Sequence, residues 1–234
     1  MLSIQEPSAK LTELQPTIKC LSLSAFDTSE LKAVREVFRP AARLALGQAW
    51  LEREEHDFAP AFVRVGWRGN SLLVFAEVID FDIFNAATAL NQRAWELGDV
   101  FEIFLQPTDQ PAYVEFQVTP NNQRVQLRFT NAVAAENVRR NGSMESVLIP
   151  DEAFFSRTWV QPGACWYVYA EISAEKLFRQ AGPLQGRQWR FSFSRYDYTR
   201  GREQPVISST SRHAEPDFHR QPEWGVMSFE FSMP

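Results

Sequence analysis

Short runs of alternating apolar and polar residues, each ended by turn-forming residues, constrain the fold of this chain more than any other feature. Two of the turn signals are Gly69-Asn70 and Pro120-Asn121-Asn122. Because the side chains of a strand point alternately to the two faces of a sheet, such runs predict β-strands, and the short turns predict hairpins. Strands are predicted at residues 17–23, 61–68, 71–80, 98–105, 112–119, 123–130, 158–161, 165–172, 188–198 and 225–231.

The number and spacing of these strands predict an all-β fold, an antiparallel β-sandwich of the jelly-roll or immunoglobulin-like kind with one or two short helices. One helix is predicted where Asp27 and Glu30 form a capping box, and it must end before Pro40. A second is predicted near residues 173–180, with Ser173 as its N-cap. The chain has no internal repeat and no linker-like segment. Residues 1–234 are therefore predicted to form a single domain, in which residues 1–60 are an N-terminal extension packed on a core of about 61–232.

Composition narrows the class of protein. Hydrophobic residues make up 44% of the chain and aromatic residues 13%, enough to fill a core without disulfides. The formal charge of −5 argues against a nucleic-acid partner, whose phosphates require concentrated positive charge. Cys20 and Cys165 lie far apart without metal-ligand spacing, and both are predicted to be buried free thiols.

The first residues carry neither the basic start nor the apolar stretch of a signal peptide. No apolar run approaches the ~18 residues of a membrane span. No membrane association is therefore expected, and the cytoplasm is the default compartment on these grounds.

The second faces of the predicted strands are more polar than the first. In residues 98–105, Phe101, Ile103 and Leu105 share one face and are predicted to be core. The groups on the opposite faces that can hydrogen-bond to hydroxyls are Glu102, Glu115, Gln117 and Arg190. Tyr113 and Trp95 are expected to be exposed beside them. Flat aromatic surface next to polar groups suits a neutral sugar ring, but a sheet face left to water gives the same pattern, and both interpretations stay open.

Three segments of the sequence carry recognisable motifs, and they follow one another in a characteristic order. AWELGDVFEIFL at 94–105 places a Trp ahead of acidic residues and an alternating strand, and YVEFQV at 113–118 is a second such strand. PDFHRQPEWG at 216–225 leads into the last predicted strand. Together they resemble the family 9 carbohydrate-binding modules and the related DOMON-like sandwiches. The resemblance covers roughly residues 63–231, since 166–172 and 189–195 fall where the family has two further segments.

The resemblance implies a non-catalytic protein that binds a mono- or oligosaccharide through an aromatic and polar site on a sheet face. By position, Trp95 would form one wall, Glu102 would accept a hydrogen bond from a sugar hydroxyl, and Gln117 would lie where some members have an arginine. Phe218 and His219 would form the second wall, because the Trp that other members carry shortly before the last strand is missing here. The family also implies an extracytoplasmic location and a glycoside hydrolase or another protein as a partner.

A DOMON-like sandwich that binds haem, another cofactor or a protein is the alternative. Axial haem ligation needs a buried Met or His on facing strands, and among the methionines only Met227 lies in a predicted strand. His213 and His219 match no standard ligand spacing, so no metal site is predicted there. A structural Ca²⁺ held by loop oxygens around residues 80–82 is left open, and no other cofactor is expected.

The patterns of known enzymes are incomplete in this sequence. Ser173 and Lys176 have the Ser-x-x-Lys spacing of penicillin-recognising enzymes but lack the companion motifs. Glu102 and Glu115 could imitate a glycosidase pair, whose carboxyls lie about 5–5.5 Å apart in retaining enzymes. On an open sheet face they would lack the desolvated cleft that raises the pKa of the acid, so no enzyme activity is predicted.

Overall fold

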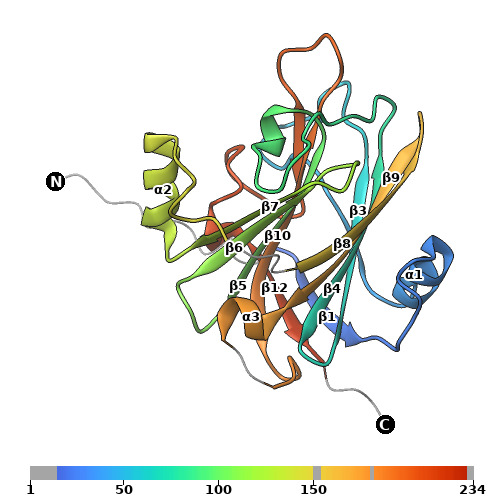
Figure 1. Cartoon of the computed structure of the whole chain (residues 1–234), viewed down its shortest axis with the longest axis vertical. Helices are drawn as coiled ribbons and strands as arrows, with labels where there is room; N and C mark the ends of the chain where they lie inside the picture. The colour runs from blue at the N-terminus through green and yellow to red at the C-terminus, as the bar shows by residue number, and fades with distance from the viewer. Residues whose placement is uncertain (1–14, 150–153, 180–181, 231–234) are drawn as a thin grey trace.

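The computed structural model describes residues 15–149, 154–179 and 182–230, which form two β-sheets packed face to face (Figure 1). The first sheet runs in the order β7 (Arg124–Phe129), β6 (Tyr113–Val118), β5 (Val100–Pro107), β10 (Gln188–Asp197), β12 (Gly225–Phe229) and β1 (Thr17–Ser22), with β11 (Val206–Ser209) paired to β10. The second runs in the order β1, β3 (Ala61–Arg68), β4 (Ser71–Ile79), β9 (Cys165–Ser173) and β8 (Phe154–Gln161), with β2 (Arg43–Ala45) paired to β3. The predicted all-β sandwich is confirmed, and β2 and β11 are strands that the alternation does not predict.

Strand β1 belongs to both sheets. Thr17 to Cys20 pair with β12, and Leu21 and Ser22 pair with β3. Both pairings are parallel, so the expectation of a purely antiparallel sandwich is wrong at this strand. Parallel neighbours need no short turn between them, and β1 is separated from both partners by long stretches of chain. The N-terminal segment thus supplies the strand that joins the two sheets.

The inner faces of the two sheets form an aromatic-rich core. Phe101, Ile103 and Leu105 of β5 are fully buried there, as predicted, against residues such as Trp166 and Val168 of β9. Burying each such side chain contributes on the order of 2 kcal/mol. Both Cys20 and Cys165 are buried and free, which confirms the prediction for the cysteines.

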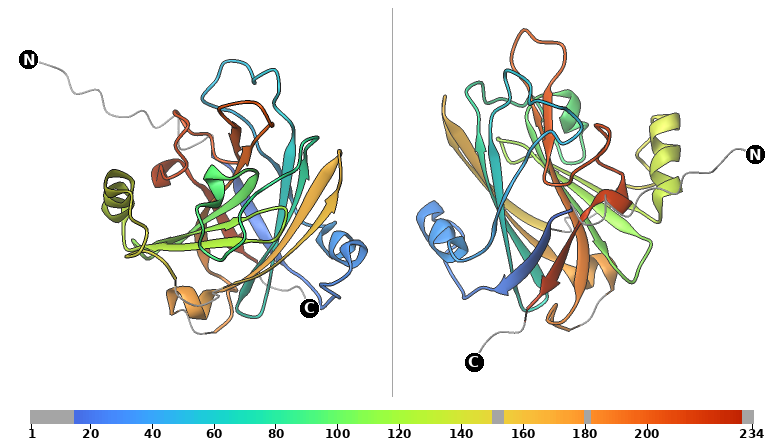
Figure 2. Two further views of the ribbon diagram at one scale, coloured as in Figure 1. Left: turned by 45° about the horizontal axis from the view of Figure 1, so that its top comes forward. Right: turned by 180° about the vertical axis from the view of Figure 1, so that it is seen from behind.

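Each sheet is also covered on its outer face. Helix α1 (Leu31–Phe38) packs Val34 and Phe38 onto β3 and β4. On the opposite side of the molecule, α2 (Ala132–Asn141) stands beyond β7 (Figure 1; Figure 2). Beside it, a segment that includes η3 (Gln221–Glu223) packs Phe218 and Trp224 onto Phe104 of β5. The polar outer face of the first sheet is therefore largely covered, and β5 is buried along its whole length.

The helices agree only in part with the predictions. Helix α3 (Ala174–Phe178) begins after Ser173, whose Oγ accepts a hydrogen bond from the Lys176 N–H at 3.5 Å, as predicted. Helix α1 begins after Glu30 without a side-chain cap, because Asp27 instead accepts from the backbone N–H and hydroxyl of Ser29. The predicted capping box is therefore wrong, although the helix is present and ends before Pro40.

Helix α2 brings the number of α-helices among the described residues to three, one more than the upper expectation. Asn131 caps its start by accepting from the Ala134 N–H at 3.0 Å, and Gly142 ends it with a φ of 68°. The pair Asn141-Gly142 suggests a loop in the sequence. Because a helix C-cap needs the same left-handed backbone as a turn, this local signal cannot distinguish the two.

Candidate functional site

A pocket of about 440 Å³ opens on the outer face of the first sheet. This volume lies within the range of small-molecule sites. Strands β5, β6, β7 and β10 form its floor, while η2 (Ala94–Glu96), α2 and residues 216–219 form its rim. Its principal lining residues are Arg93, Trp95, Glu102, Phe104, Glu115, Gln117, Phe129, Arg139, Met144, Tyr196, Asp217, Phe218 and His219.

The polar floor of the pocket consists of three side chains on neighbouring strands. Glu102 of β5 is paired in register with Gln117 of β6, and Glu115 lies two residues before Gln117 on the same face. The Nε2 atom of Gln117 donates to Oε1 of Glu102 at 2.9 Å and to Oε1 of Glu115 at 2.7 Å. One amide group thus holds two carboxyls side by side on one wall.

Two acceptor atoms of this floor have no hydrogen-bond partner. They are Oε2 of Glu102 and Oε1 of Gln117, and the two side chains belong to residues only 3% and 1% exposed. A buried polar atom without a partner costs about 1–3 kcal/mol, so native proteins rarely keep one without a reason. Both side chains line the pocket, but the two atoms have almost no exposed surface, so a ligand that donates to them must shift these side chains slightly.

Burial also shifts the proton affinity of the two carboxyls. Desolvation, with the charge of Glu115 adding to it, raises the pKa of Glu102 well above its ordinary value. Desolvation raises the pKa of Glu115 to about 7, although the hydrogen bond from Gln117 opposes the shift. The open, water-facing environment expected for this pair is therefore wrong, because α2 and residues 216–219 cover the sheet face that carries them.

Aromatic rings surround the polar floor. Phe104, Phe129 and Tyr196 lie on the strands, while Trp95 and Phe218 come from the rim. The Phe218 ring contacts those of Phe104 and Tyr196, with centroids 6.4 and 5.8 Å away. Apolar walls around a few polar groups are the usual composition of a small-molecule site.

The position of Trp95 depends on a turn that only glycine can make. Gly98 has a φ of 137°, and a Cβ there would lie 2.4 Å from the carbonyl oxygen of Phe84. The Tyr198 hydroxyl donates to the carbonyl of Trp95 at 2.6 Å, which anchors the turn to the end of β10. Arg93 lies 5.8 Å from the Trp95 ring and donates to the carbonyl of Gly142, which ties η2 to the end of α2.

An ion pair joins α2 to the segment that carries Phe218. The two terminal nitrogens of Arg139 donate to the two carboxylate oxygens of Asp217 at 3.1 and 2.6 Å. Burial opposes ionisation of Asp217, but the hydrogen bonds from Arg139 and from the His219 backbone outweigh it and lower its pKa. Such bidentate pairs are geometrically specific, so this one sets how α2 and residues 216–219 meet at the rim.

His219 connects the rim to the floor. Its Nδ1 lies 2.8 Å from the Tyr113 hydroxyl, and its Nε2 lies 3.4 Å from Oε2 of Glu115. Burial, with the nearby charge of Arg139, lowers the pKa of His219 to about 3. The ring is therefore neutral at pH 7, and both of its nitrogens have partners within the protein.

The structure brings six of the eight predicted site residues together in the pocket, namely Trp95, Glu102, Glu115, Gln117, Phe218 and His219. Tyr113, expected to be exposed, is fully buried and stacks on Phe129 at 4.8 Å behind the lining. Arg190 lies outside the pocket lining and donates to the Gln221 carbonyl at 3.4 Å. Its strand position is on the same face, but the register of β10 on β5 pairs Arg190 with Gln106 and Ser194 with Glu102, so Arg190 lies farther along the sheet from the pocket floor.

Sequence reasoning missed the residues that α2 contributes, above all Arg139 and Ala135. It also missed Tyr196, which shares a strand face with Ser194 and Arg190 and could have been found by extending the alternation of β10. No sequence signal would have placed α2 on this pocket, because that contact depends on the Arg139–Asp217 pair, which joins residues 78 positions apart.

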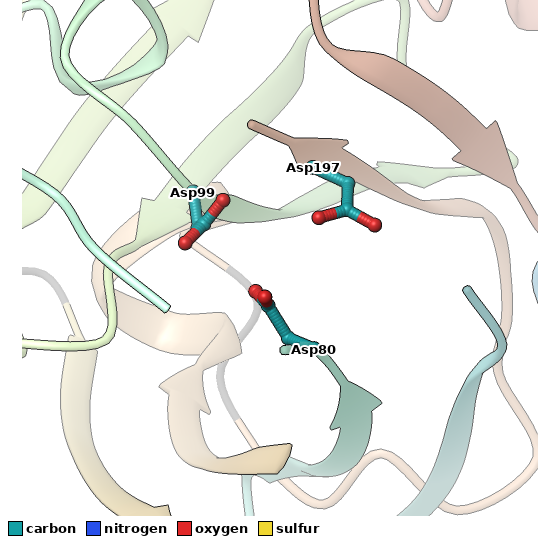
Figure 3. A group of neighbouring side chains, drawn as sticks. All are labelled: Asp80, Asp99 and Asp197. Atoms are coloured by element: carbon teal, nitrogen blue, oxygen red, sulfur yellow. The ribbon is translucent and has the colours of Figure 1, made fainter. Parts of the chain in front are cut away.

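A second group of acids lies at the ends of β4, β5 and β10. Asp80, Asp99 and Asp197 turn their carboxylates toward one another, with one oxygen of each within 4.8 Å of the others (Figure 3). The guanidinium of Arg195, fully buried, lies 3.1 Å from Asp80 and 2.9 Å from Asp197. Both oxygens of Asp99 accept backbone N–H groups, those of Phe84 and Tyr198.

The partners of these three aspartates bear on whether they could bind the structural Ca²⁺ that the sequence leaves open. Ca²⁺ requires several oxygens directed at the ion, but the charge of Arg195 lies beside Asp80 and Asp197, and backbone N–H groups donate to both oxygens of Asp99. Asp82, the other acid considered, pairs with Arg200. The charge of Arg195 beside two of the three carboxylates disfavours Ca²⁺ at this group.

Comparison with known proteins was made for the sequence and for the structure. No protein-family model matches the sequence, and no curated protein matches it. A candidate carbohydrate-binding protein from Bacteroides uniformis has a similar structure, with a TM-score of 0.68 and 15% identity over 92% of this chain and 99% of the other. A family 9 carbohydrate-binding module from Caldicellulosiruptor kristjanssonii, solved with cellotriose, gives a TM-score of 0.66 and 16% identity over 94% of this chain and 95% of the module.

The chain has the fold of the family 9 carbohydrate-binding modules. The same kind of module solved with glucose, also from Caldicellulosiruptor kristjanssonii, gives a TM-score of 0.63 at 16% identity, covering 94% of this chain and 97% of the module. The family resemblance predicted from the three sequence segments is thus confirmed for the fold. Among the described residues, no helix has the length and apolar character needed to cross a bilayer.

Proposed function

We propose that this chain is a non-catalytic sugar-binding protein and that the pocket over β5, β6, β7 and β10 is its binding site. The observation that carries the proposal is the pair of buried, unpartnered acceptors, Oε2 of Glu102 and Oε1 of Gln117, beside aromatic walls. A pyranose offers what this arrangement lacks, because its hydroxyls donate hydrogen bonds while its C–H faces pack on rings such as Trp95. The fold shared with sugar-binding modules supports the same conclusion.

The raised pKa of Glu115, about 7, invites comparison with a glycosidase acid, so catalysis needs separate consideration. In glycosidases the two carboxyls flank the scissile bond. Here one amide nitrogen of Gln117 bonds to both carboxyls, which holds them together on one wall. That arrangement suits hydrogen bonding to hydroxyl or amino groups of a ligand better than cleavage of a glycosidic bond.

The haem alternative finds less support in the geometry. Both ring nitrogens of His219, the histidine in the pocket lining, already contact Tyr113 and Glu115. Met227 lies in the core between the sheets and is absent from the pocket lining. Axial ligation would require one of these side chains to give up its present packing.

Calorimetric titration with mono- and oligosaccharides tests the proposal. Wild type is expected to bind at least one sugar with a dissociation constant on the order of μM to mM. Trp95→Ala should weaken binding by about 2 kcal/mol or more, since an aromatic wall of this kind acts as an anchor. Trp159→Ala, at a half-buried Trp of β8 in the other sheet, is the matched control and should leave affinity unchanged.

Two results would contradict the proposal. If no sugar in the panel binds wild type, the pocket has another ligand. If Trp95→Ala remains folded and binds as tightly as wild type, the sugar lies elsewhere on the molecule. Absence of hydrolysis products after long incubation with oligosaccharides is expected, and their appearance would overturn the non-catalytic assignment.

A further inference from the structure

When Glu102 is ionised, the two unsatisfied atoms of the pocket floor are both acceptors. Oε2 of Glu102 and Oε1 of Gln117 accept no hydrogen bond, while the donor nitrogen of Gln117 is already shared between Glu102 and Glu115. A ligand that brings donors therefore suits the ionised form of this wall. It gains little by bringing further acceptors.

The floor also lacks a positive charge. Among the described residues that line the pocket, Arg139 is held by both oxygens of Asp217, and Arg93 pairs with Glu96 and with a backbone carbonyl. His219 is neutral at pH 7 because burial lowers its pKa. When ionised, the two carboxyls lie side by side in a desolvated place with no cation bonded to them, an arrangement that either protonation or a cationic partner relieves.

The walls suit a cation as well. Trp95, Phe104, Phe129, Tyr196 and Phe218 surround the floor, and the faces of such rings carry the negative end of a quadrupole. Aromatic walls above an acidic floor attract an organic cation more strongly than a neutral group. A sugar hydroxyl supplies a single donor and no charge, whereas an ammonium group supplies three donors and one positive charge.

We propose that the pocket selects an amino sugar, a pyranose that carries a protonated amine, and that the ammonium group binds at Glu102, Glu115 and Gln117. This inference rests on the proposed function and narrows its ligand class. A terminal glucosamine residue of a deacetylated glycan has this chemistry. N-acetylation removes the charge and two of the three N–H donors, so N-acetylglucosamine should be a poor ligand.

Titration calorimetry with four probes at one pH, 6.5, and one ionic strength tests the inference. The probes are D-glucosamine, N-acetyl-D-glucosamine, D-glucose and cyclohexylamine, the last being a six-membered ring with an ammonium group and no hydroxyls. We expect glucosamine to bind at least tenfold more tightly than glucose or N-acetylglucosamine. Cyclohexylamine should bind more weakly than glucosamine, because it lacks the hydroxyls.

A charge-neutral variant locates the preference. In Glu102→Gln, which keeps the shape of the side chain, the ratio of glucosamine to glucose affinity should fall toward one. Glu36→Gln removes one charge from exposed α1 on the other sheet and is the matched control, in which the ratio should stay as in wild type. Circular dichroism spectra confirm that each variant is folded before its ratio is interpreted.

Proton release gives an independent readout. With the pKa of Glu115 at about 7 and that of Glu102 well above its ordinary value, the pair holds protons at pH 6.5 that a bound ammonium should expel. Titrations in two buffers of different ionisation enthalpy should therefore show protons released with glucosamine and none with glucose. The other ionisable groups that line the pocket are Tyr196, Arg139, Asp217, His219 and Arg93, and Tyr113 lies behind the lining near Glu115.

The outcomes separate this inference from the proposed function. If wild type binds glucosamine and glucose equally, and Glu102→Gln has the same ratio of the two affinities, the amino-sugar inference is wrong and sugar binding still stands. Binding of cyclohexylamine without binding of any sugar would overturn both. A preference for glucosamine that Glu102→Gln abolishes and Glu36→Gln retains would establish the inference.

Discussion

The residues of the pocket floor work against the stability of the free protein. Glu102 and Glu115 are buried beside each other, and their carboxyls are satisfied only in part by Gln117. A buried carboxyl that keeps its proton costs less than one that ionises, which is why both pKa values rise. Binding sites commonly retain such destabilising groups because a ligand compensates for them.

Glu115→Gln is expected to stabilise the free protein at pH 8 relative to wild type. A raised folded-state pKa gives stability that is fully present below the unfolded value of about 4.5 and is lost as pH rises through the folded value of about 7. Within this window, a difference of one bound proton between the folded and unfolded states changes the free energy of unfolding by up to about 1.4 kcal/mol per pH unit. The glutamine variant lacks this loss, so its urea-unfolding free energy should fall less steeply from pH 5 to pH 8.

Glu36→Gln, which removes an exposed carboxylate, should follow the wild-type slope. Some slope should remain in Glu115→Gln, because burial also raises the pKa of Glu102, of Asp99 to about 8 and of Asp197 to about 7. An unchanged slope in Glu115→Gln would mean that Glu115 is ionised in the folded protein.

Among the elements, α2 is the one on which the pocket most depends. It contributes Ala135, Val138 and Arg139 to the rim. Of the strands of the sheet, it packs mainly against β7. A ten-residue helix is marginal in isolation, so its end caps and its ion pair to Asp217 carry much of its stability. Loss of one cap should therefore affect the rim before it affects the sandwich.

Asn131→Ala removes the N-cap of α2 and is expected to destabilise that helix by about 1 kcal/mol. Sugar affinity should fall several-fold, because part of the population then lacks the ordered rim. Ser173→Ala removes the corresponding cap from α3, which is outside the pocket lining, and should leave affinity unchanged. Equal effects of the two variants on affinity would show that α2 does not shape the site.

On the scale of the whole molecule, β1 links the two sheets. It lies between β12 and β3, and its Cys20 is fully buried in the core shared by both sheets. Burial raises the pKa of the Cys20 thiol far above its ordinary value, so the reactive thiolate is suppressed in the folded state. Exposure of Cys20 requires the sheets to separate around β1.

Cys165→Ala leaves Cys20 as the single thiol and makes it a reporter of global unfolding. In the absence of denaturant, Ellman's reagent should label it at least a thousandfold more slowly than in the unfolded chain, consistent with a stability of several kcal/mol. The labelling rate should rise with urea in parallel with the unfolding seen by tryptophan fluorescence. Rapid labelling without urea would show that β1 detaches locally while the sandwich stays folded.

Local sequence patterns determined much of this protein. Alternation and turn residues predicted β3 at its observed bounds and most other strands within a few residues, because strand faces and tight turns depend on neighbouring residues alone. The alternation in β5 also separated its core residues, such as Phe101, from its site residues, such as Glu102. The resemblance of three segments to the family 9 modules led to the correct fold as well.

Only the tertiary structure decided what covers those strands. Whether Glu102 faces water or a desolvated pocket depends on α2 and on residues 216–219, which join it through the Arg139–Asp217 pair. The burial of Tyr113, the displacement of Arg190 from the pocket and the parallel pairing of β1 likewise depend on contacts distant in sequence. An alternating pattern specifies that a strand has two faces, but the partner of each face is chosen by the packing of the whole chain.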